Sequence, residues 1–445
     1  MGIVSLWLRP KDVAAQKIIM YNNKSASFGR RNRNSQTSNS GGFRNFSAPR
    51  SSFGNSRPSF GGKSRFGNSR KPKRFGENLD ASLFIKKAEE IIKIEEVEVK
   101  NSFDDFGFDQ ILLKNIRDKG YIKPTQIQDE VIPMVMSGRD ILGIANTGTG
   151  KTAAFVLPII NQIIKDSSKR YLILAPTREL AQQIKEEIRS FTFGLKVYVT
   201  LAIGGAFMRE QIMDIRRDPH IIVGTPGRIK DLGDRRVINF SNMDVLVLDE
   251  VDRMLDMGFI NDIRSIVEKI SINRQTLFFS ATMDRKIETL VNSFLQDPAK
   301  ISIRTQNVSN HVEQNIVVVN RNDKQEMLVR LLKQSEFKKV LVFGATKMMV
   351  EKISNNLIDA GFRAGSLHGD KPQHKRQRTL RMFKENEINI LIATDVAARG
   401  LDVADISHVI NFDKPNNYED YIHRIGRTGR ANAKGYALTF VESRY

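Results

Sequence analysis

The most constraining feature of this sequence is a series of short apolar runs, each ending in polar or glycine-rich residues, that alternates with amphipathic helical patterns. Apolar strands between helices are typical of a parallel sheet with both faces covered. The first runs are Ile141 to Ala145, Tyr171 to Ala175, Ile221 to Val223, Val245 to Leu248 and Thr276 to Phe279. The pattern restarts at Ile316 to Val319, Val340 to Phe343, Ile390 to Ala393, His408 to Phe412 and Tyr436 to Val441. Because one sheet of more than about ten strands is uncommon, the sequence predicts two successive α/β domains.

Composition adds flanking segments to these domains. Residues 24–76 are rich in Ser, Asn, Gly, Arg and Phe and contain no acid. Such a segment buries too little apolar area to offset chain entropy, so we expect it to be disordered. The predicted order is a disordered basic tail, a connecting helical segment, a first domain, an interdomain linker and a second domain, at residues 1–76, 77–102, 103–303, 304–310 and 311–445.

Most of the excess positive charge lies in the tail. The chain has a net charge of +20, and residues 1–76 hold sixteen Lys or Arg and one acid. Arginines alternate there with Phe53, Phe60, Phe66 and other phenylalanines, which pairs phosphate-binding cations with rings that can stack on bases. This pattern favours RNA binding, and a purely solubilising tail is the alternative. A transit peptide, or a true start at Met20, stays open for the first residues.

Residue content also argues against several classes of protein. The chain has no cysteine, which excludes disulfides and thiolate-bound metals, and its six histidines fall singly, so we predict no zinc site. Its apolar runs are well short of the ~20 residues of a membrane span, so we predict no membrane partner. We therefore expect a soluble protein of a reducing compartment, located in the cytoplasm.

The first segment that carries chemistry lies between the strand Ile141–Ile144 and a predicted helix at Ala153–Lys165. Its glycines let the backbone wrap a phosphate, and the amides at the helix start face that phosphate. Lys151 would neutralise the β- and γ-phosphates, while the Thr152 hydroxyl would bind Mg²⁺. The generic loop begins with Gly where this chain has Ala145. The predicted phosphate contacts are Thr147, Gly148, Thr149, Gly150, Lys151 and Thr152.

The second segment is the acidic run at the end of the apolar strand Val245–Leu248. Ligands bind at the carboxyl ends of strands in open α/β sheets. Asp249 is therefore predicted to hold Mg²⁺, and Glu250 to orient and deprotonate the attacking water. A solvated acidic turn before a helix is the alternative, which the phosphate loop in the same domain makes less favourable.

These segments and their order resemble the DEAD-box family of ATP-dependent RNA helicases, from about Phe103 to Val441. The resemblance implies two tandem RecA-like domains, with ATP and Mg²⁺ as cofactors. A Phe followed by Gly120-Tyr121-Ile122-Lys123-Pro124-Thr125-Gln126-Ile127-Gln128 matches the family's adenine-binding motif. It implies that Phe103 stacks on the base, that Gln128 hydrogen-bonds its edge and that Tyr121 lines the same site.

The resemblance further implies a track for RNA, single-stranded or duplex, over both domains. The residues concerned are strand-end loops that offer amides, hydroxyls and guanidinium groups to the sugar-phosphate backbone, so binding is expected to be independent of base sequence. The implied contacts are Pro176, Thr177, Arg178, Gly205, Thr225 and Arg228 in the first domain, and Gln373, Arg376, Thr394 and Arg399 in the second.

Three further motifs are assigned by the same resemblance. Ser280 and Thr282, after their own strand, resemble the motif that links hydrolysis to domain closure. Asp402 resembles the residue that holds the ATP ribose. Within His423-Arg424-Ile425-Gly426-Arg427-Thr428-Gly429-Arg430, Arg427 and Arg430 are expected to reach the γ-phosphate as arginine fingers, although such a row of arginines also suits a solvated helix face or an RNA patch.

The expected activity is RNA-stimulated ATP hydrolysis coupled to local, non-processive unwinding of RNA duplexes or to remodelling of RNA–protein complexes. An ATP-gated RNA clamp or annealing chaperone is the principal alternative. A non-catalytic RNA-binding scaffold and a DNA helicase fit these residues less well. One departure from the family is Val251, which stands where the family name records Ala. A second is the pair Gly344-Ala345, where larger or polar residues are common.

Overall fold

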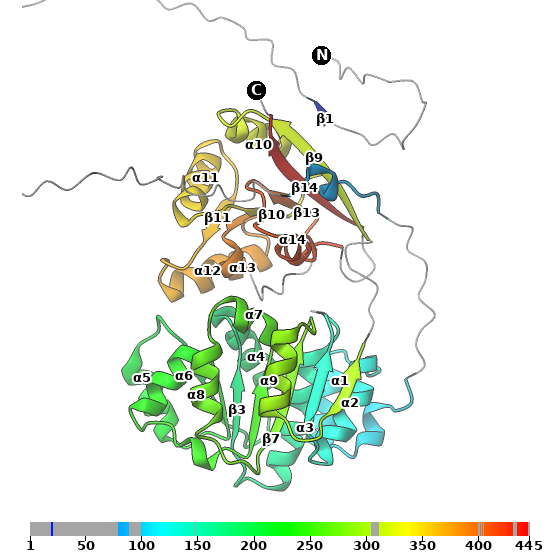
Figure 1. Ribbon diagram of the computed structural model, residues 1–445, viewed down its shortest axis with the longest axis vertical. Helices are drawn as coiled ribbons and strands as arrows, with labels where there is room; N and C mark the ends of the chain where they lie inside the picture. Colours follow the sequence, from blue (N-terminus) through cyan, green and yellow to red (C-terminus); the bar gives the residue numbers. More distant parts are fainter. Residues whose placement is uncertain are drawn as a thin grey trace, which may run out of the picture.

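The computed structural model describes residues 19–20, 79–88, 99–146, 148–303, 311–398, 401, 403, 405–429 and 434–443. Within these residues it contains two parallel sheets of seven strands each, in two α/β domains that lie one above the other in Figure 1. The predicted fold class of two tandem RecA-like domains is confirmed. The predicted linker 304–310 and all but two residues of the predicted tail lie outside the described residues.

The first domain surrounds a sheet of strand order β4-β5-β3-β6-β7-β2-β8. Its strands are β2 (Ile141–Ile144), β3 (Tyr171–Leu174), β4 (Val199–Ala202), β5 (Ile221–Gly224), β6 (Val245–Leu248), β7 (Gln275–Ser280) and β8 (Ala299–Ser302). Its helices are α1 (Gln110–Asp118), α2 (Gln126–Met136), α3 (Lys151–Lys165), α4 (Arg178–Phe191), α5 (Met208–Arg216), α6 (Pro226–Asp234), α7 (Val251–Asp256), α8 (Ile260–Val267) and α9 (Arg285–Phe294), with 3₁₀ turns η2 (Phe103–Phe106) and η3 (Phe240–Asn242).

The second domain repeats this arrangement around a sheet of order β1-β9-β14-β13-β10-β12-β11. Its strands are β1 (Ile19–Met20), β9 (Val312–Val319), β10 (Val340–Phe343), β11 (Ala364–Leu367), β12 (Ile390–Ala393), β13 (His408–Asn411) and β14 (Gly435–Glu442). Its helices are α10 (Lys324–Leu332), α11 (Lys347–Asp359), α12 (Gln373–Lys384), α13 (Asp395–Ala398) and α14 (Tyr418–Ile425).

Alternate residues of each central strand enter apolar cores on opposite faces of the sheet. In β6, Val245 and Val247 pack in the core beneath α1 to α4, whereas Leu246 and Leu248 pack in the core beneath α5 to α9. All four are buried, so the strand has to be apolar throughout. The polar residues that follow each strand are thereby brought to one edge of the sheet, which faces the other domain.

Four strands, β1, β4, β8 and β11, were not predicted from the sequence. Each is the last strand at an end of its sheet, and β4, β8 and β11 leave part of their side chains exposed. Their runs are correspondingly less apolar than those of the central strands. Among the described residues, no helix has both the length and the apolar character that a membrane span requires.

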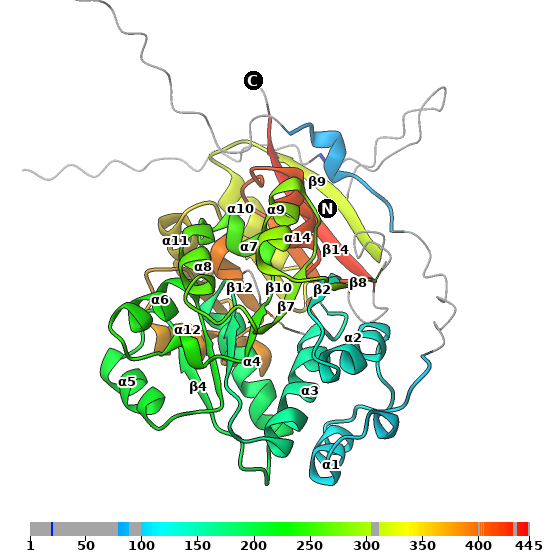
Figure 2. The ribbon, with the colours of Figure 1, turned by 60° about the horizontal axis from the view of Figure 1, so that its bottom comes forward.

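The chain before the first domain lies against the second domain. Residues 79–88 contain a 3₁₀ turn, η1 (Ala81–Phe84), and then an isolated antiparallel bridge from Lys86 to Gln314 of β9. β1 pairs with the same strand in parallel, at Val317 and Val318. Both views show the blue turn η1 beside β9 and β14 (Figures 1 and 2). Residues 77–78 and 89–98 of the predicted connecting helical segment, 77–102, lie outside the described residues.

Candidate ATP and RNA site

The phosphate loop joins β2 to the N-terminus of α3. Gly148 and Gly150 have φ angles of 86° and 91°, which glycine adopts without strain. Lys151 is buried, and its Nζ donates a hydrogen bond to the Ala145 carbonyl oxygen at 2.7 Å. The lysine charge is thus held over the loop, next to the partly buried Thr152 at the start of α3. Thr147 lies outside the described residues.

Gln128 is hydrogen-bonded to the phosphate loop. Its Nε2 donates to the Gly150 carbonyl oxygen at 3.2 Å, and its Oε1 accepts from the Thr125 amide at 2.9 Å. A Cβ atom on Gly150 would lie 2.6 Å from Gln128 Nε2, so only glycine fits there. The predicted adenine contact is therefore joined to the loop that receives the phosphates.

The other two predicted adenine-site residues lie in the core of the first domain. Phe103 is buried, and its ring packs edge-on against Phe106 and Tyr121, with centroid distances of 6.2 Å to each. The Tyr121 hydroxyl donates to Glu187 at 3.3 Å. This cluster precedes α2, the helix that carries Gln128, and the Tyr121 ring also packs edge-on against Phe191 at the end of α4, with 5.6 Å between centroids.

Asp249 is a buried carboxylate at the end of β6. Burial, together with repulsion from Glu250, outweighs the attraction of Lys151 and raises the pKa of Asp249 to about 6. Its Oδ1 atom has no hydrogen-bond partner among the described residues. An unpartnered buried carboxylate oxygen suits Mg²⁺, which in proteins typically binds one or two carboxylates and takes its remaining ligands from water and substrate phosphates.

The described residues offer no group of three or more His, Asp or Glu side chains arranged to hold a metal ion. Mg²⁺ held by Asp249 and Thr152 would take its remaining ligands from water and nucleotide phosphates.

Glu250 differs from its neighbour in its electrostatic environment. Its backbone is left-handed, with φ of 52°, at the N-terminus of α7. Burial acts to raise the pKa of Glu250, but the cationic side chains around it together hold that pKa below its usual range. In decreasing order of effect, these cations are Arg253, Lys151, Arg427 and His423. Glu250 is thus kept ionised, as a general base must be.

The predicted coupling motif lies beside this acidic turn. Ser280 is fully buried at the end of β7, and its Oγ accepts a hydrogen bond from the Thr282 amide at 3.3 Å. Asp252 faces the same turn, where burial raises the pKa of its carboxyl and the Ala281 amide opposes that rise. Ser280 and Thr282 are therefore close to the first turn of α7, which begins directly after Glu250.

Arg427 enters this environment from the second domain. It is 4% exposed, and its guanidinium donates to the Leu401 carbonyl oxygen at 2.7 Å. Because Arg427 contributes to lowering the pKa of Glu250, its charge acts across the gap between the domains. Two other predicted ATP contacts, Asp402 and Arg430, lie outside the described residues.

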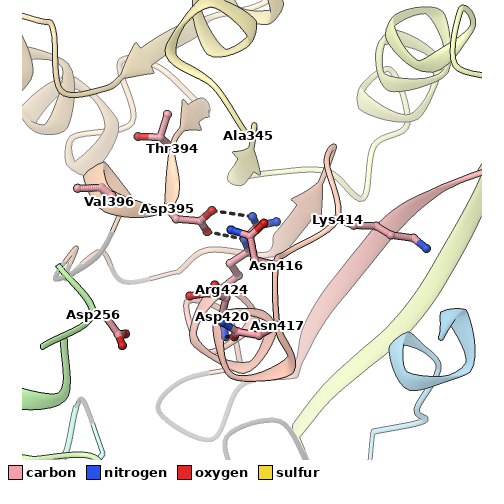
Figure 3. A pocket seen from close by; sticks show the side chains of 10 residues that line it. All are labelled: Asp256, Ala345, Thr394, Asp395, Val396, Lys414, Asn416, Asn417, Asp420 and Arg424. Atoms are coloured by element: carbon pink, nitrogen blue, oxygen red, sulfur yellow. Dashed lines mark hydrogen bonds and ion pairs between the residues drawn. The ribbon is translucent and has the colours of Figure 1, made fainter. Parts of the chain in front are cut away.

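Arg424, three residues earlier, is held by contacts within the second domain. Its guanidinium forms paired bonds with Asp395, at 2.5 and 2.7 Å, and lies 5.0 Å above the ring of Phe343. Asp395 and Arg424 line a cavity of about 400 Å³, whose lining also includes Thr394 and, from α7 of the first domain, Asp256. Figure 3 shows the Asp395–Arg424 pair at its centre.

Most of the predicted RNA contacts line a second cavity, of about 410 Å³. It receives loops from both domains. Burial, followed by repulsion from Arg376, lowers the pKa of Arg178, so the lining is rich in positive charge that suits phosphate. The predicted contacts along it are Pro176, Thr177, Arg178, Thr225, Arg228 and Arg376.

An ion pair joins the domains at this cavity. Arg376 of α12 contacts Glu179 of α4 through Nε at 2.8 Å and NH2 at 2.7 Å, and both side chains are buried. Arg376 also donates to the His368 carbonyl oxygen at 3.2 Å. The sequence did not indicate this role for Glu179, because the two residues are 197 positions apart.

Three of the other predicted RNA contacts, Gly205, Thr394 and Gln373, are among the described residues. Gly205 has φ of 77°, and a side chain there would overlap the Arg178 guanidinium. Thr394 lines the cavity of Figure 3. The amide nitrogen and oxygen of Gln373 are buried without hydrogen-bond partners among the described residues. Arg399 lies outside them.

Comparison with known proteins identifies the family. A model described as "DEAD/DEAH box helicase" matches residues 125–290, and one described as "Helicase conserved C-terminal domain" matches residues 323–432. ATP-dependent RNA helicase CshA of Listeria monocytogenes is 44% identical over 344 residues, which are 77% of this chain and 66% of that protein. CshA of Limosilactobacillus reuteri is 43% identical over 341 residues, or 76% of this chain and 69% of that protein.

The chain therefore belongs to the DEAD-box family of ATP-dependent RNA helicases, and it spans about two thirds of the length of these relatives. Solved structures agree. S. cerevisiae Dbp5 bound to RNA and ADP BeF3 is 30% identical, with a TM-score of 0.69 over 77% of this chain and 90% of that one. Mss116p bound to ssRNA and AMP-PNP is also 30% identical, with a TM-score of 0.70 over 78% and 75% of the two chains.

Proposed function

We propose that this protein is an RNA-stimulated ATPase that couples ATP binding and hydrolysis to local, non-processive unwinding of RNA duplexes or to remodelling of RNA–protein complexes. The observation that carries this proposal is the division of both sites between the domains. Glu250 of the first domain feels the charge of Arg427 from the second, and one cavity gathers RNA-track residues from both. Relatives of similar fold with RNA and nucleotide bound support the two ligand classes.

Each side chain of the ATP site has a separate role in hydrolysis. Lys151 binds the phosphates at the start of α3, and Glu250 accepts the proton of the attacking water because its neighbours keep it ionised. Arg427 stabilises the charge that develops on the transferred phosphoryl group. Asp249 and Thr152 would hold Mg²⁺, which supplies additional positive charge at the phosphates when bound.

RNA enters this scheme through closure of the cleft. Since ATP and RNA each contact both domains, binding of one lowers the free energy that closure requires for the other. RNA therefore stimulates ATP hydrolysis. Closure around a single strand disfavours the paired form locally, and release of products allows the cleft to reopen. Cytoplasmic location remains part of this proposal.

An ATP-gated clamp or annealing chaperone with little unwinding is the second candidate. The buried pair between Arg376 and Glu179 favours it, because that pair joins the two domains directly at the RNA cavity and would stabilise a closed clamp. A duplex-release assay with ATP, a non-hydrolysable analogue or no nucleotide separates the two functions. Release that requires ATP supports a helicase, whereas RNA-stimulated hydrolysis without release supports a clamp.

Glu250→Gln provides the sharpest single test. Loss of the base should abolish turnover while ATP still stabilises RNA binding, because Gln keeps the shape of the side chain. ATPase rates and RNA affinity with and without ATP measure this, and Glu288→Gln on the exposed face of α9 is a matched control. Rapid ATP hydrolysis by Glu250→Gln would overturn the assignment of the base.

A further inference from the structure

Residues 79–88, which precede the first domain in sequence, are bound to the second. The backbones of Lys86 and Gln314 exchange two hydrogen bonds, of 3.0 Å from the Lys86 amide and 2.7 Å from the Gln314 amide. Asp80 caps η1 through the Ser82 amide at 2.9 Å. We call residues 79–88 the N-terminal hook. It lies beside the first half of strand β9 and beside the helix α14 (Figure 2).

The main apolar contact of the hook with the second domain is the aromatic side chain of Phe84. Phe84 has no exposed surface and lies in an apolar cluster of its own with β9, β14 and α14. Its ring meets that of Tyr421 edge-on, with 4.7 Å between centroids. Leu83, the neighbouring residue, is 44% exposed. Phe84 is the one fully buried side chain of the hook, and Leu79, Ala81 and Ile85 pack against the same cluster while partly buried.

The ring contact of Phe84 and the backbone bridge of Lys86 are connected through Gln314. The Tyr421 hydroxyl donates to the Gln314 side chain at 3.0 Å, and the Gln314 backbone is the partner of Lys86. Tyr421 and Ile425 both lie on α14 and both pack in the Phe84 cluster. One face of α14 is therefore covered by a segment from outside the second domain.

This helix ends two residues before Arg427, on which the proposed hydrolysis depends. Ile425 ends α14, and only Gly426 separates it from Arg427. An isolated helix of eight residues is unstable in water, so its position comes from packing. A misplacement of about 1 Å in a catalytic site can reduce a rate roughly 100-fold.

We propose that the N-terminal hook holds α14 in place, with Phe84 as a positioning residue for Arg427. The proposal rests on the proposed role of Arg427 in ATP hydrolysis. The hook also fixes the place where the basic tail joins the folded chain, because residue 79 lies on the second domain. The chain contacts the first domain from Lys100 and Asn101 onward, whose amides donate to Asp129 at 2.8 and 3.1 Å.

The first experiment tests docking. The chain has no cysteine, so spin labels can be attached at Ser82→Cys and Glu326→Cys, two exposed positions on the hook and on α10. A narrow distance distribution that becomes broad in the Phe84→Ala variant supports the docked hook. A broad distribution with Phe84 intact overturns the proposal, whatever the ATPase activity.

The second experiment tests positioning. Phe84→Ala should lower the kcat of RNA-stimulated ATP hydrolysis by about tenfold with little change in the KM for ATP, because the phosphate loop is untouched. Phe84→Leu should restore most of the rate, and Leu83→Ala is the matched control. Removal of residues 1–88 should reproduce the loss, whereas removal of residues 1–78 should not. An unchanged kcat in Phe84→Ala with the hook released overturns the positioning role.

Failure of the proposed function gives a different result. If Arg427→Ala hydrolyses ATP normally, the arginine-finger role is wrong even when the hook docks. If Arg427→Ala is inactive, adding Phe84→Ala to it should cause no further loss, because both changes act through the same group. A further loss of similar size in the double variant would show that Phe84 acts elsewhere and would contradict the proposal.

Discussion

Arg427 shows how one residue can make hydrolysis depend on two domains. Its guanidinium is fixed to the backbone of Leu401 in the second domain, while its charge acts on Glu250 in the first. Arg424 has the same chemistry but is fully engaged with Asp395, Asn411 and the Asp413 carbonyl oxygen. Of these two arginines, Arg427 is the one whose charge acts on Glu250, and we therefore assign the role at the phosphate to Arg427.

Arg427→Ala should reduce RNA-stimulated ATP hydrolysis by about 10³ to 10⁵, the effect of removing an arginine finger. That loss corresponds to roughly 4 to 7 kcal/mol of transition-state stabilisation. RNA binding should persist, since Arg427 does not line the RNA cavity. Steady-state ATPase rates and RNA titration measure the two effects. Arg321→Ala, at an exposed position of the same domain, is the control, and near-normal turnover of Arg427→Ala would contradict the assignment.

A second residue-scale prediction concerns pH. His408 is buried between the rings of Phe337 and Tyr436, and burial lowers its pKa to about 4. A depressed histidine pKa stabilises the fold fully above the unfolded pKa near 6.5, and this contribution is lost as pH falls from there toward 4. The loss should be on the order of 3 kcal/mol.

Urea unfolding at pH 7 and pH 4.5 measures this effect. His408→Phe keeps a ring in the stack but cannot gain a proton, so its free energy of unfolding should fall less between the two pH values. An equal fall in both proteins would show that other groups cause the acid sensitivity. His311→Phe, at a partly buried histidine before β9, serves for comparison.

At the level of elements, the central strands were predictable because each is apolar on both faces. The edge strands β4, β8 and β11 were not, since half-exposed runs look like loops in sequence. β9 begins at Val312, earlier than predicted, because its polar first half is paired with β14 and with the hook. The phosphate loop and the acidic turn were predictable because local residues define them. The Glu179–Arg376 pair and the Phe84 cluster depend on segments brought together only by the fold.

The departure at Val251 is an element-scale feature that can be tested. Val251 is fully buried in the first turn of α7 and packs in the core beneath α5 to α9. Val251→Ala would remove two methyl groups from that core and should lower the free energy of unfolding by about 1 to 3 kcal/mol. RNA-stimulated ATP hydrolysis should stay close to that of the unchanged protein, because the side chain packs in the apolar core.

Thermal unfolding and steady-state ATPase assays on the same preparation measure both quantities. Val247→Ala, a buried valine of β6 in the opposite core, provides a matched change in volume away from α7. A large loss of activity in Val251→Ala alone, with the stability unchanged, would show that Val251 shapes the Mg²⁺ site rather than the core.

At the scale of the whole molecule, the two-domain organisation was predictable from the repeated strand pattern, but the attachment of the chain before it was not. Deleting residues 1–76 should weaken RNA binding and flatten its dependence on salt, because fewer phosphates would be neutralised. Basal ATP hydrolysis should be unaffected, since the hook remains. RNA titration at several salt concentrations measures the slope, and an unchanged affinity and slope would leave the tail a role in solubility only.

The docked hook also changes the mechanics of the hinge. The chain passes between the domains twice, from residue 88 to residue 99 and again from residue 303 to residue 311. On the second domain both passages end at β9, where Lys86 meets Gln314. Two covalent connections that leave the second domain from neighbouring points restrict rotation of one domain relative to the other more than one connection would. The first passage spans at most roughly 40 Å, so it also limits how far the cleft can open.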